Sequence, residues 1–544
     1  PIGKSLCSQI KDDLSIICKS IRVVDVYTIL AELTSEELEK VATELFTDSV
    51  IQIASINQHI QFPQEYQHVV EVGFRPGVTD NVGKSAREGI QDTLSRNLKP
   101  EEFVFKSTMY WFSGLSKEDC SRVAQQLLAN ELIQHWKVLS LDELSSKKDI
   151  SLLPIPLVTE KTESTVETIS LNLSDSELLE LSQKRLLALD LREMKAIKDY
   201  YENPITKKHR KELNLPEYPT DIELEILAQT WSEHCKHKIF NAEIKFEDNN
   251  GNYTVVNSLF KTFIKSTTEK LKSEIPWLVS VFHDNAGLIE FDEENLISMK
   301  VETHNSPSAL DPYGGAITGI VGVNRDILGA GLGCRCILNT DVFCFASPFY
   351  EGKIPERLLH PRRVLRGVHA GVRDGGNQSG IPTVNGAIVF HERFLGKPLV
   401  FCGTGGIIPK KINNKLAHEK KAYKDDLIVM IGGRIGKDGI HGATFSSEEL
   451  HEGSPVTAVQ IGDPITQKKL SDFLFEARDR GLYNAITDNG AGGLSSSVGE
   501  MARGSGGAKI HLDRAPLKYT CLLYTSDAAD DLLCVDLGGS RIIK

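Results

Sequence analysis

A segment that occurs twice within the first 140 residues constrains the fold more than any other feature. One copy starts at Leu33-Thr34-Ser35-Glu36-Glu37 and the other at Leu115-Ser116-Lys117-Glu118-Asp119, and in each an apolar helical pattern leads into a strand-like segment. Thr34 and Ser116 suit helix N-caps because a hydroxyl accepts a hydrogen bond from the free N–H groups of a first turn. The repeat therefore predicts a repeated supersecondary unit.

Strand-like segments flank the repeated helices, and a further helical pattern lies between them. The strands are expected at Val23–Leu30, Val50–Ile53, His68–Gly73, Phe105–Phe112 and Ile133–Val138, and the further helix at Val82–Leu98. This order predicts repeated ferredoxin-like β-α-β units, an antiparallel sheet with helices on one face. No catalytic constellation stands out here, so packing or partner docking is the expected role.

The composition and the apolar pattern of the sequence change twice after this region. Residues 140–180 are rich in Ser, Lys, Glu and Thr, which indicates a linker, and helical patterns follow at Asp175–Tyr201 and Asp221–Lys238. From Leu278 short apolar strands alternate with glycine-rich turns, which favours an α+β or α/β catalytic domain. A further subdomain is expected near Asp425, before strand Leu427–Ile431. The predicted divisions are 1–140, 141–220, 221–424, 425–519 and 520–544.

Composition excludes several functional classes. The 74 acidic and 62 basic residues give a net charge of −12, which argues against general nucleic-acid binding because that requires a basic face. The ten cysteines are scattered without a dense disulfide framework, so a reducing cytoplasm is expected. No apolar run is long enough to predict a membrane span. The chain starts at Pro1 with neither an initiator Met nor a signal peptide, as in a fragment.

The first candidate motif is Trp231-Ser232-Glu233-His234-Cys235-Lys236-His237-Lys238, at the end of a predicted amphipathic helix. Leu224, Leu227 and Trp231 are expected to face a core. His234 and His237, three residues apart, would share a face. A functional histidine pair and a plain C-terminal cap with solvated histidines both fit this pattern. Two histidines alone do not make a zinc site.

The second candidate is the segment from Ile297 to Pro307. Strand alternation puts Met299 and Val301 on one face and Lys300 and Glu302 on the other, with His304 at the strand end. A cation for phosphate, a hard oxygen ligand for magnesium and a titratable imidazole would then lie in line. An exposed edge strand with a charged face is the alternative reading.

Two glycine-rich segments complete the candidates. Asp311–Asp326 places glycines beside Arg325-Asp326, which can contact phosphate and metal together, although structural turns fit equally well. Gln460–Pro464 precedes Asp488–Leu494, where Asp488 is either a magnesium carboxylate at a strand end or a plain Asx-turn. No Gly-x-Cys-x-Gly elbow occurs in the sequence, so a glutaminase thiol has no candidate. Cys334 and Cys336 lack the paired spacing of a metal site.

Taken in order, these motifs resemble the synthetase part of the phosphoribosylformylglycinamidine synthases. The resemblance rests on Trp231–Lys238, Lys300–Pro307, Gly314–Asp326, Gln460–Pro464 and Asp488–Leu494, and it covers roughly residues 175–519. The front region resembles the family's small accessory subunit, most closely in His68–Leu94. The implied fold class is α+β, with the ferredoxin-like units and linker followed by a synthetase half like that of aminoimidazole ribonucleotide synthetase.

The resemblance also implies a reaction and a set of site residues. The family uses ATP and Mg²⁺ to phosphorylate the amide oxygen of formylglycinamide ribonucleotide, and ammonia then displaces the phosphate. The implied catalytic residues are His234 and His304, the implied ATP contacts Lys300 and His237, and the implied metal ligands Glu302, Asp326 and Asp488. The implied substrate contacts are Thr303, His304, Asn305, Ser306, Arg325 and Gln460.

This sequence departs from the family pattern at several places. His237 stands where many relatives have Tyr, and Ser306 where many have a second His. Ammonia is expected from a separate glutaminase subunit, with the front domain as its docking platform. After Tyr519 the family would continue into a Glu-Ser-Gln motif and a second half, whereas the tail resembles sequencing-adapter read-through, so residues 520–544 are expected to be non-native and the fragment inactive by itself.

Two rival functions remain open. One is another ATP-using relative, such as aminoimidazole ribonucleotide synthetase or a phosphate-transferring kinase, against which the front repeat and the His234 motif count. The other is a non-catalytic scaffold or regulatory subunit, against which the retention of Lys300, Glu302, His304 and Asp326 counts.

Overall fold

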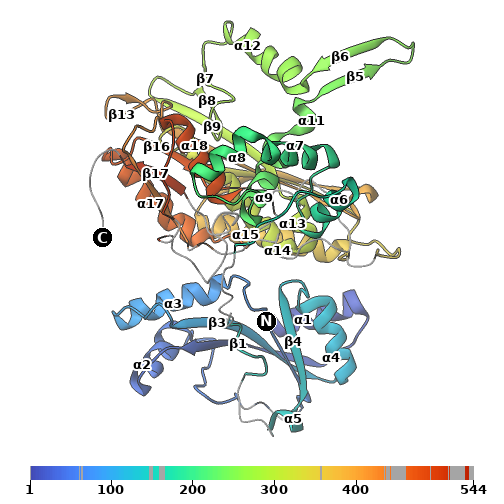
Figure 1. Cartoon of the computed structure of the whole chain (residues 1–544). Coiled ribbons are helices and arrows are strands. Elements are labelled where there is room, and N and C mark those ends of the chain that lie inside the picture. Colours follow the sequence, from blue (N-terminus) through green and yellow to red (C-terminus); the bar gives the residue numbers. More distant parts are fainter. Residues whose placement is uncertain are drawn as a thin grey trace. The chain divides into compact units, whose positions relative to one another are not determined.

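The computed structural model divides the chain into two compact units, residues 1–160 and 161–544 (Figure 1). It describes residues 2–60, 65–145, 151–157, 166–355, 358–433, 461–490, 492–511 and 533–537, with single positions at 62, 435, 442 and 514. Each unit is considered by itself. No helix among these residues is long and apolar enough to cross a membrane.

The N-terminal unit is built on a four-stranded antiparallel sheet in the order β1-β3-β2-β4. The strands are β1 (Ser20–Leu30), β2 (His68–Phe74), β3 (Phe103–Ser113) and β4 (Gln134–Ser140), and the helices α1 (Ile2–Leu14), α2 (Ser35–Lys40), α3 (Asn81–Leu94), α4 (Lys117–Val123) and α5 (Leu141–Ser145). One core packs Val70 and Phe112 of the sheet against Ile10 of α1 and Val123 of α4. A second core, around Trp111, lies on the opposite face.

Both predicted N-caps are present in this unit. The Thr34 hydroxyl accepts from the Glu37 N–H at 3.2 Å, and the Glu37 carboxylate accepts from the Thr34 N–H at 2.8 Å. Ser116 Oγ accepts from the Asp119 N–H at 3.0 Å. The repeated sequence therefore starts two helices, α2 and α4, by the same local chemistry.

The strand predicted at Val50–Ile53 is wrong. The segment forms an exposed turn in which Val50 is 88% and Ile51 is 78% exposed. Its β-branched residues suit a strand, but no neighbouring strand pairs with them here, and strand preference is a property of packing rather than of the segment alone. The helix predicted to reach Leu98 ends at Leu94, because Ser95 adopts the left-handed conformation.

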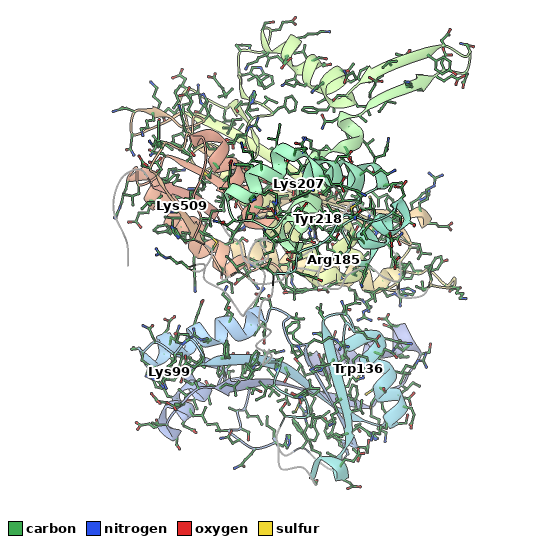
Figure 2. All side chains as sticks on the ribbon, in the orientation of Figure 1. Lys99, Trp136, Arg185, Lys207, Tyr218 and Lys509 are labelled. Atoms are coloured by element: carbon green, nitrogen blue, oxygen red, sulfur yellow. The ribbon has the colours of Figure 1, made fainter. Side chains whose placement is uncertain are left out.

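A group of short helices opens the second unit. They are α6 (Asp175–Lys184), α7 (Leu191–Glu202), α8 (Pro204–Glu212), α9 (Asp221–Thr230), α10 (Glu233–Lys236) and α11 (Lys238–Asn241). The helix predicted at Asp175–Tyr201 is interrupted, since Leu186 and Ala188 have positive φ and Asp190 caps a new helix. Arg185 pairs with Glu167, and Lys207 with Glu217 at 2.6 Å. Figure 2 labels Arg185 and Lys207 on this part of the chain.

The centre of this unit is a six-stranded sheet in the order β11-β10-β12-β9-β8-β7. Its strands are β7 (Leu278–Ser280), β8 (Gly287–Glu290), β9 (Asn295–Thr303), β10 (Arg335–Phe345), β11 (Thr383–Phe390) and β12 (Leu399–Pro409). Helices α14 (Pro312–Gly329) and α15 (Pro361–Ser379) pack on one face through Ile320, Val368 and Phe343. The short helix α13 (Asn305–Leu310) joins β9 to α14.

Smaller elements surround this sheet. The hairpin of β5 (Glu243–Glu247) and β6 (Tyr253–Asn257) precedes α12 (Ser266–Lys272), and β13 (Lys411–Ile412) pairs with β14 (Lys415–Leu416). A second sheet has the order β15-β17-β16, from Leu427–Ile431, Leu533–Leu537 and Ala485–Asp488. Helices α17 (Pro464–Asp479) and α18 (Gly493–Ser505) accompany it. Strand β17 lies within residues 520–544, the segment expected to be non-native. That expectation stays a prediction.

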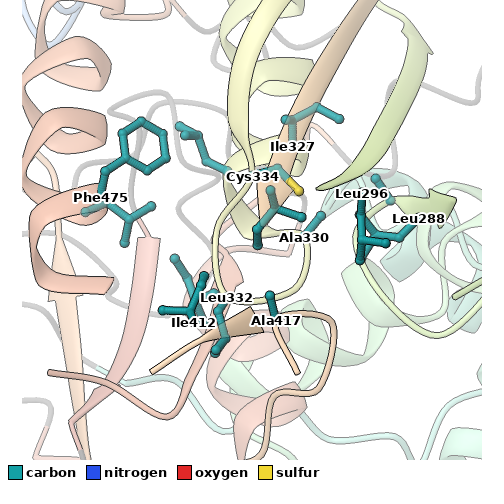
Figure 3. Close-up of a cluster of buried hydrophobic side chains, with 14 of the residues drawn as sticks. Leu288, Leu296, Ile327, Ala330, Leu332, Cys334, Ile412, Ala417 and Phe475 are labelled. Carbon is teal, nitrogen blue, oxygen red and sulfur yellow. The ribbon is translucent and has the colours of Figure 1, made fainter. Parts of the chain in front are cut away.

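One large core joins the six-stranded and the three-stranded sheet of this unit. Leu288 of β8, Leu296 of β9 and Ile327 of α14 share it with Phe475 of α17 and Ile486 of β16, and Figure 3 shows Cys334, Ala330 and Leu332 within it. Since α14 contributes to this core as well as to the core under α15, it is fixed on both sides. Side chains on α14, β9 and β16 can therefore hold a rigid mutual geometry.

Candidate functional site

A lysine surrounded by carboxylates lies at the centre of the candidate site. Lys300 Nζ is 3.3 Å from Glu302 Oε1 and 3.5 Å from Asp326 Oδ2. Lys300 and Glu302 belong to β9, and Asp326 to α14, which packs against that strand. Burial works against the charge of Lys300, but the neighbouring carboxylates of Asp326 and Glu302 raise its pKa overall. The ammonium is therefore fixed in its charged form.

The carboxylates of this site carry more negative charge than its cations neutralise. The pKa of Asp326 is raised well above its ordinary value, first by burial and then by the charges of Asp488 and Glu302, despite the opposing effect of Lys300. The three carboxylates predicted as metal ligands thus lie within electrostatic reach of one another. They come from three different elements, β9, α14 and β16.

Asp488 is held from two sides at the end of β16. Its Oδ2 accepts from Arg325 Nε at 3.2 Å, and its Oδ1 accepts from the side-chain amide of Asn285. Gly490 lies against this pair, since a Cβ there would be 3.0 Å from Asp488 Oδ2. The Asx-turn alternative for Asp488 does not describe these contacts, because its oxygens bond to residues far away in the sequence.

His304 lies where β9 ends and α13 begins, and its ring is fixed by one backbone group. Nδ1 is 2.5 Å from the carbonyl oxygen of Gly315, and a Cβ at Gly319 would be 3.2 Å from His304 Cβ. A carbonyl only accepts, so Nδ1 carries the proton and Nε2 keeps its lone pair. Burial lowers the pKa of His304 to about 4, despite the opposing Gly315 bond and Glu302 charge. The imidazole is therefore neutral at physiological pH.

The other predicted site residues differ in their exposure and in their contacts. Thr303 ends β9 and is exposed, Asn305 Oδ1 accepts from the Val400 N–H at 2.8 Å, and Ser306 is buried in α13. His234 is exposed on α10 and is one of the smaller contributors to the lowered pKa of His304. Gln460 lies outside the described residues.

The structure separates His234 from His237, which were predicted to share a helix face. His237 has φ of 52° and lies between α10 and α11, so the two histidines are not on one continuous helix. No hydrogen bond or ion pair joins the His237 ring to the carboxylate cluster in the described part of the chain. The prediction that Leu224, Leu227 and Trp231 face a core is confirmed for α9 and its C-cap. Leu224 is buried, and Leu227 and Trp231 pack against the same cluster.

Two alternative readings of the motifs are wrong. Strand β9 lies between β12 and β8, so it is no edge strand, and Met299 and Val301 are exposed while Lys300 is more buried. The glycine-rich segment after Asp311 forms the long buried helix α14 rather than a series of turns. Its glycines permit close packing: a Cβ at Gly315 would be 2.4 Å from the Ser308 nitrogen.

Sequence reasoning missed a layer of polar residues behind the site. Asn285, Asp284 and Lys420 form one network, in which Lys420 pairs with Asp284 and donates to the Gly329 carbonyl at 2.7 Å. A second, buried network joins α14 to its surroundings through Asn324, which bonds to Thr404 and Gln467. These residues lie far apart in the sequence, and only the small Asp-Asn-Ala-Gly turn could have drawn attention to Asn285.

The described residues do not form a ready-made metal centre. No group of three or more His, Cys, Asp or Glu side chains among them is arranged to hold a metal ion. The Lys300 ammonium lies close to Glu302 and Asp326 instead. The donor set nevertheless consists of carboxylates, the hard oxygen ligands that Mg²⁺ prefers.

Comparison with known proteins assigns three regions of the chain. Residues 178–238 match the formylglycinamide ribonucleotide amidotransferase linker domain, residues 283–408 the N-terminal domain of AIR synthase related proteins, and residues 424–533 their C-terminal domain. The candidate site lies in the last two regions, and the His234 motif in the first.

Individual relatives agree with these domain matches. The phosphoribosylformylglycinamidine synthase subunit PurL of Thermoplasma acidophilum is 36% identical over 359 residues, 64% of this chain and 42% of the relative. The PurL subunit of Thermotoga maritima is 33% identical over 303 residues, 55% of this chain and 42% of the relative. A structure of T. maritima PurL complexed with FGAR is 29% identical, with a TM-score of 0.44, and covers 61% of this chain and 47% of that one.

The paired N- and C-terminal domains define an AIR synthase related protein. Together with the amidotransferase linker and the PurL relatives, they show that the chain belongs to the phosphoribosylformylglycinamidine synthase family. The matched part spans less than half of the length of these curated relatives.

Proposed function

We propose that this chain carries the ATP site and the proton acceptor for the conversion of formylglycinamide ribonucleotide to formylglycinamidine ribonucleotide in purine biosynthesis. One observation carries the proposal: a neutral His304 with an accepting Nε2 lies within electrostatic reach of Glu302 and Arg325, which belong to the carboxylate and cation cluster around Lys300. A phosphoryl transfer followed by an amine attack needs both parts.

The charged cluster has the composition that phosphoryl transfer requires. Lys300 and Arg325 supply positive charge for phosphate groups, and Glu302, Asp326 and Asp488 are the proposed magnesium ligands. When bound, the metal would neutralise phosphate charge during transfer. The raised pKa of Asp326, caused by burial and by Asp488 and Glu302, supports this role because it marks an excess of negative charge in the site.

His304 is the proposed proton acceptor. The amide oxygen of the substrate attacks the γ-phosphorus of ATP and releases ADP, which leaves an O-phosphorylated imidate. Ammonia then bonds to the imidate carbon, the C–O bond to phosphate breaks, and a proton of the former ammonia passes to Nε2 of His304. The lowered pKa of His304, set mainly by burial, keeps this nitrogen unprotonated before the attack.

The remaining predicted residues complete the proposed site. Thr303, Asn305, Ser306, Arg325 and Gln460 would contact the substrate, His234 would act beside His304, and His237 would contact ATP. The position of Thr303–Ser306 at the junction of β9 and α13, next to His304, supports the substrate assignment. His237 is exposed and stands where many relatives have Tyr, so its assignment rests only on its place in the Trp231–Lys238 motif.

Two rival functions are less well supported. An aminoimidazole ribonucleotide synthetase would share the AIR synthase related domains, but residues 178–238 match a linker named for the amidotransferase. A non-catalytic scaffold would have no use for a buried aspartate whose pKa is raised by burial and by neighbouring carboxylates, because buried like charges lower stability.

Partners, location and domain limits are also parts of the proposal. Ammonia would come from a separate glutaminase subunit, with no nucleic acid or membrane involved, and the enzyme would be cytoplasmic. The N-terminal antiparallel sheet with helices would be the ferredoxin-like docking platform. The proposed limits remain near residues 140, 220, 424 and 519, with residues 520–544 as a non-native tail.

The test is amidine formation by the complete natural protein with formylglycinamide ribonucleotide, ATP, Mg²⁺ and ammonium, beside a His304→Ala variant. Product that depends on ATP and substrate, and that the variant fails to make, supports the assignment. A folded, complete protein that makes no product contradicts it and favours another member of the AIR synthase related group.

A further inference from the structure

Asn285 lies between two charged groups that the proposed site uses. Its side-chain Nδ2 donates to Asp488 Oδ1, and its backbone carbonyl accepts from Lys300 Nζ at 3.2 Å. Asp488 closes β16 and Lys300 lies in β9, so this one residue connects the two sheets at the site. Sequence reasoning assigned Asn285 no role.

Asn285 supplies the second hydrogen-bond donor to the Asp488 carboxylate. Arg325 Nε holds Oδ2 at 3.2 Å from one side, and the Asn285 amide holds Oδ1 from the other. A carboxylate with a donor on each oxygen has a fixed plane and a fixed rotamer. Without Asn285, the Asp488 carboxylate would keep the contact of Oδ2 with Arg325 but lose the donor that the described structure places on Oδ1, and it could rotate.

The surroundings of Asn285 fix its own orientation. Its Oδ1 accepts from Lys420 Nζ at 3.4 Å, and Lys420 is held in turn by Asp284 and by the Gly329 carbonyl at 2.7 Å. Since Oδ1 faces a cation that only donates, the amide must present Nδ2 to Asp488. Asp284 is nearly buried and also accepts from the Gly331 N–H at 2.7 Å, so this layer has little freedom.

Gly329 leaves room for this arrangement. A Cβ at residue 329 would be 3.1 Å from both Cγ and Oδ1 of Asn285, closer than ordinary van der Waals contact. The backbone of Gly329 ends α14 without a positive φ, so alanine suits its conformation there. Gly329→Ala would therefore move Asn285 without removing it.

We propose that Asn285 is a positioning residue that fixes Asp488 for the bound metal and Lys300 for the nucleotide phosphates. This inference rests on the proposed function, because it gives Asp488 and Lys300 the roles proposed above. It predicts a specific signature: loss of the Asn285 amide weakens the magnesium-dependent part of ATP binding more than binding of ATP alone.

The test compares the Kd for ATP of the complete natural protein with Mg²⁺ and with EDTA, by titration calorimetry. Asn285→Ala and Gly329→Ala should each weaken binding with Mg²⁺ by about tenfold or more, the effect of losing a hydrogen bond to a charged group. The affinity in EDTA should change much less. Asn484→Ala, which removes a similar amide bond to Asp426 at 3.3 Å, and Gly499→Ala, which adds a methyl group in open space, are the matched controls and should bind as the parent does.

Each other outcome overturns the inference. Equal losses with Mg²⁺ and EDTA, or lower melting temperatures that explain the losses, would give Asn285 a purely structural role. Unchanged affinity in both variants would show that Asp488 needs no such support. A parent chain that binds ATP under neither condition would overturn the proposed function, and this inference with it, whereas the first two results leave the proposed function standing.

Discussion

His304 Nδ1 lies 2.5 Å from the carbonyl oxygen of Gly315, and this contact decides which ring nitrogen can take a proton. Gly315 is in the first turn of α14, where a glycine lets the helix approach the segment that follows β9. The tautomer that the proposed chemistry requires is thus a consequence of helix packing. The contact connects the fold to the proposed chemistry more directly than any other pair of residues in the site.

The pKa of His304 predicts how stability varies with pH. Burial lowers this pKa to about 4 in the folded protein. In the unfolded chain a histidine has a pKa of about 6.5, so the unfolded state binds the proton first as pH falls. The free energy of unfolding should therefore decrease between about pH 6.5 and pH 4 on account of this residue. Melting temperatures from pH 4.5 to pH 7 should fall less steeply for His304→Gln than for the parent, and parallel curves would contradict the prediction.

Gly315→Ala should loosen the contact that holds His304. The added Cβ would be 2.4 Å from the Ser308 nitrogen and 2.6 Å from the Pro307 carbonyl carbon, and backbone atoms cannot rotate away. Overpacking of this kind costs about 1–3 kcal/mol. The complete protein should lose amidine formation beyond the loss of stability, because the Gly315 carbonyl moves. Gly504→Ala meets no atom within 4 Å and serves as the control. Normal activity of Gly315→Ala would show that the tautomer is held in another way.

Removal of Arg325 should destabilise the fold as well as the site. Its pair with Asp488 is nearly buried, with side-chain exposures of 12% and 16%. Truncating one partner of a buried pair leaves the other charge uncompensated, at a cost of about 3 kcal/mol or more. Chemical denaturation should detect this for Arg325→Ala.

An exposed pair on α17 gives the comparison for Arg325. Lys468 and Asp472 are 45% and 61% exposed, and Lys468→Ala should change the free energy of unfolding by less than about 1 kcal/mol. Adding Asp488→Asn to Arg325→Ala should restore part of the lost stability, since the unpaired charge is gone. If Arg325→Ala costs no more than Lys468→Ala, Asp488 has a stronger partner than the arginine.

The features that could be predicted from the sequence are those set by local chemistry. Thr34 and Ser116 cap their helices because a hydroxyl next to a first turn needs no distant partner. The order of Lys300, Glu302 and His304 at the end of β9 followed from strand alternation, and Asp488 was correctly placed at the end of a strand.

The features that could not be predicted depend on contacts between distant segments. The β-branched segment at Val50–Ile53 lacks a neighbouring strand, which the local sequence cannot reveal. The glycines after Asp311 suggested turns, but helix α14 uses Gly315 and Gly319 to pack closely on other segments. Asn285 and Asp488 are 203 residues apart, and no spacing rule connects them.

The buried network around Asn324 gives a final prediction about how the site is supported. Asn324 Oδ1 accepts from Thr404 Oγ1 at 2.8 Å and from Asn339 Nδ2 at 3.2 Å, and its Nδ2 donates to Gln467 Oε1 at 3.2 Å. It thereby ties α14 to the central sheet and to α17. Asn324→Ala would leave several buried polar groups unpaired, and each such group costs about 1–3 kcal/mol.

Hydrogen exchange should show where this loss falls. Asn324→Ala should raise the exchange of the α17 amides, because Gln467 loses its bond to Asn324, while its bond to the Val321 carbonyl at 2.7 Å remains. Asn252→Ala removes an exposed amide bond to Asp248 at 2.9 Å in the β5–β6 hairpin and should leave α17 unchanged. Since Arg325 and Asp326 follow Asn324 on the same helix, loosening should also weaken ATP binding. Exchange that rises equally throughout the chain would instead indicate a loss of global stability, without a special role for Asn324 in joining α14 to α17.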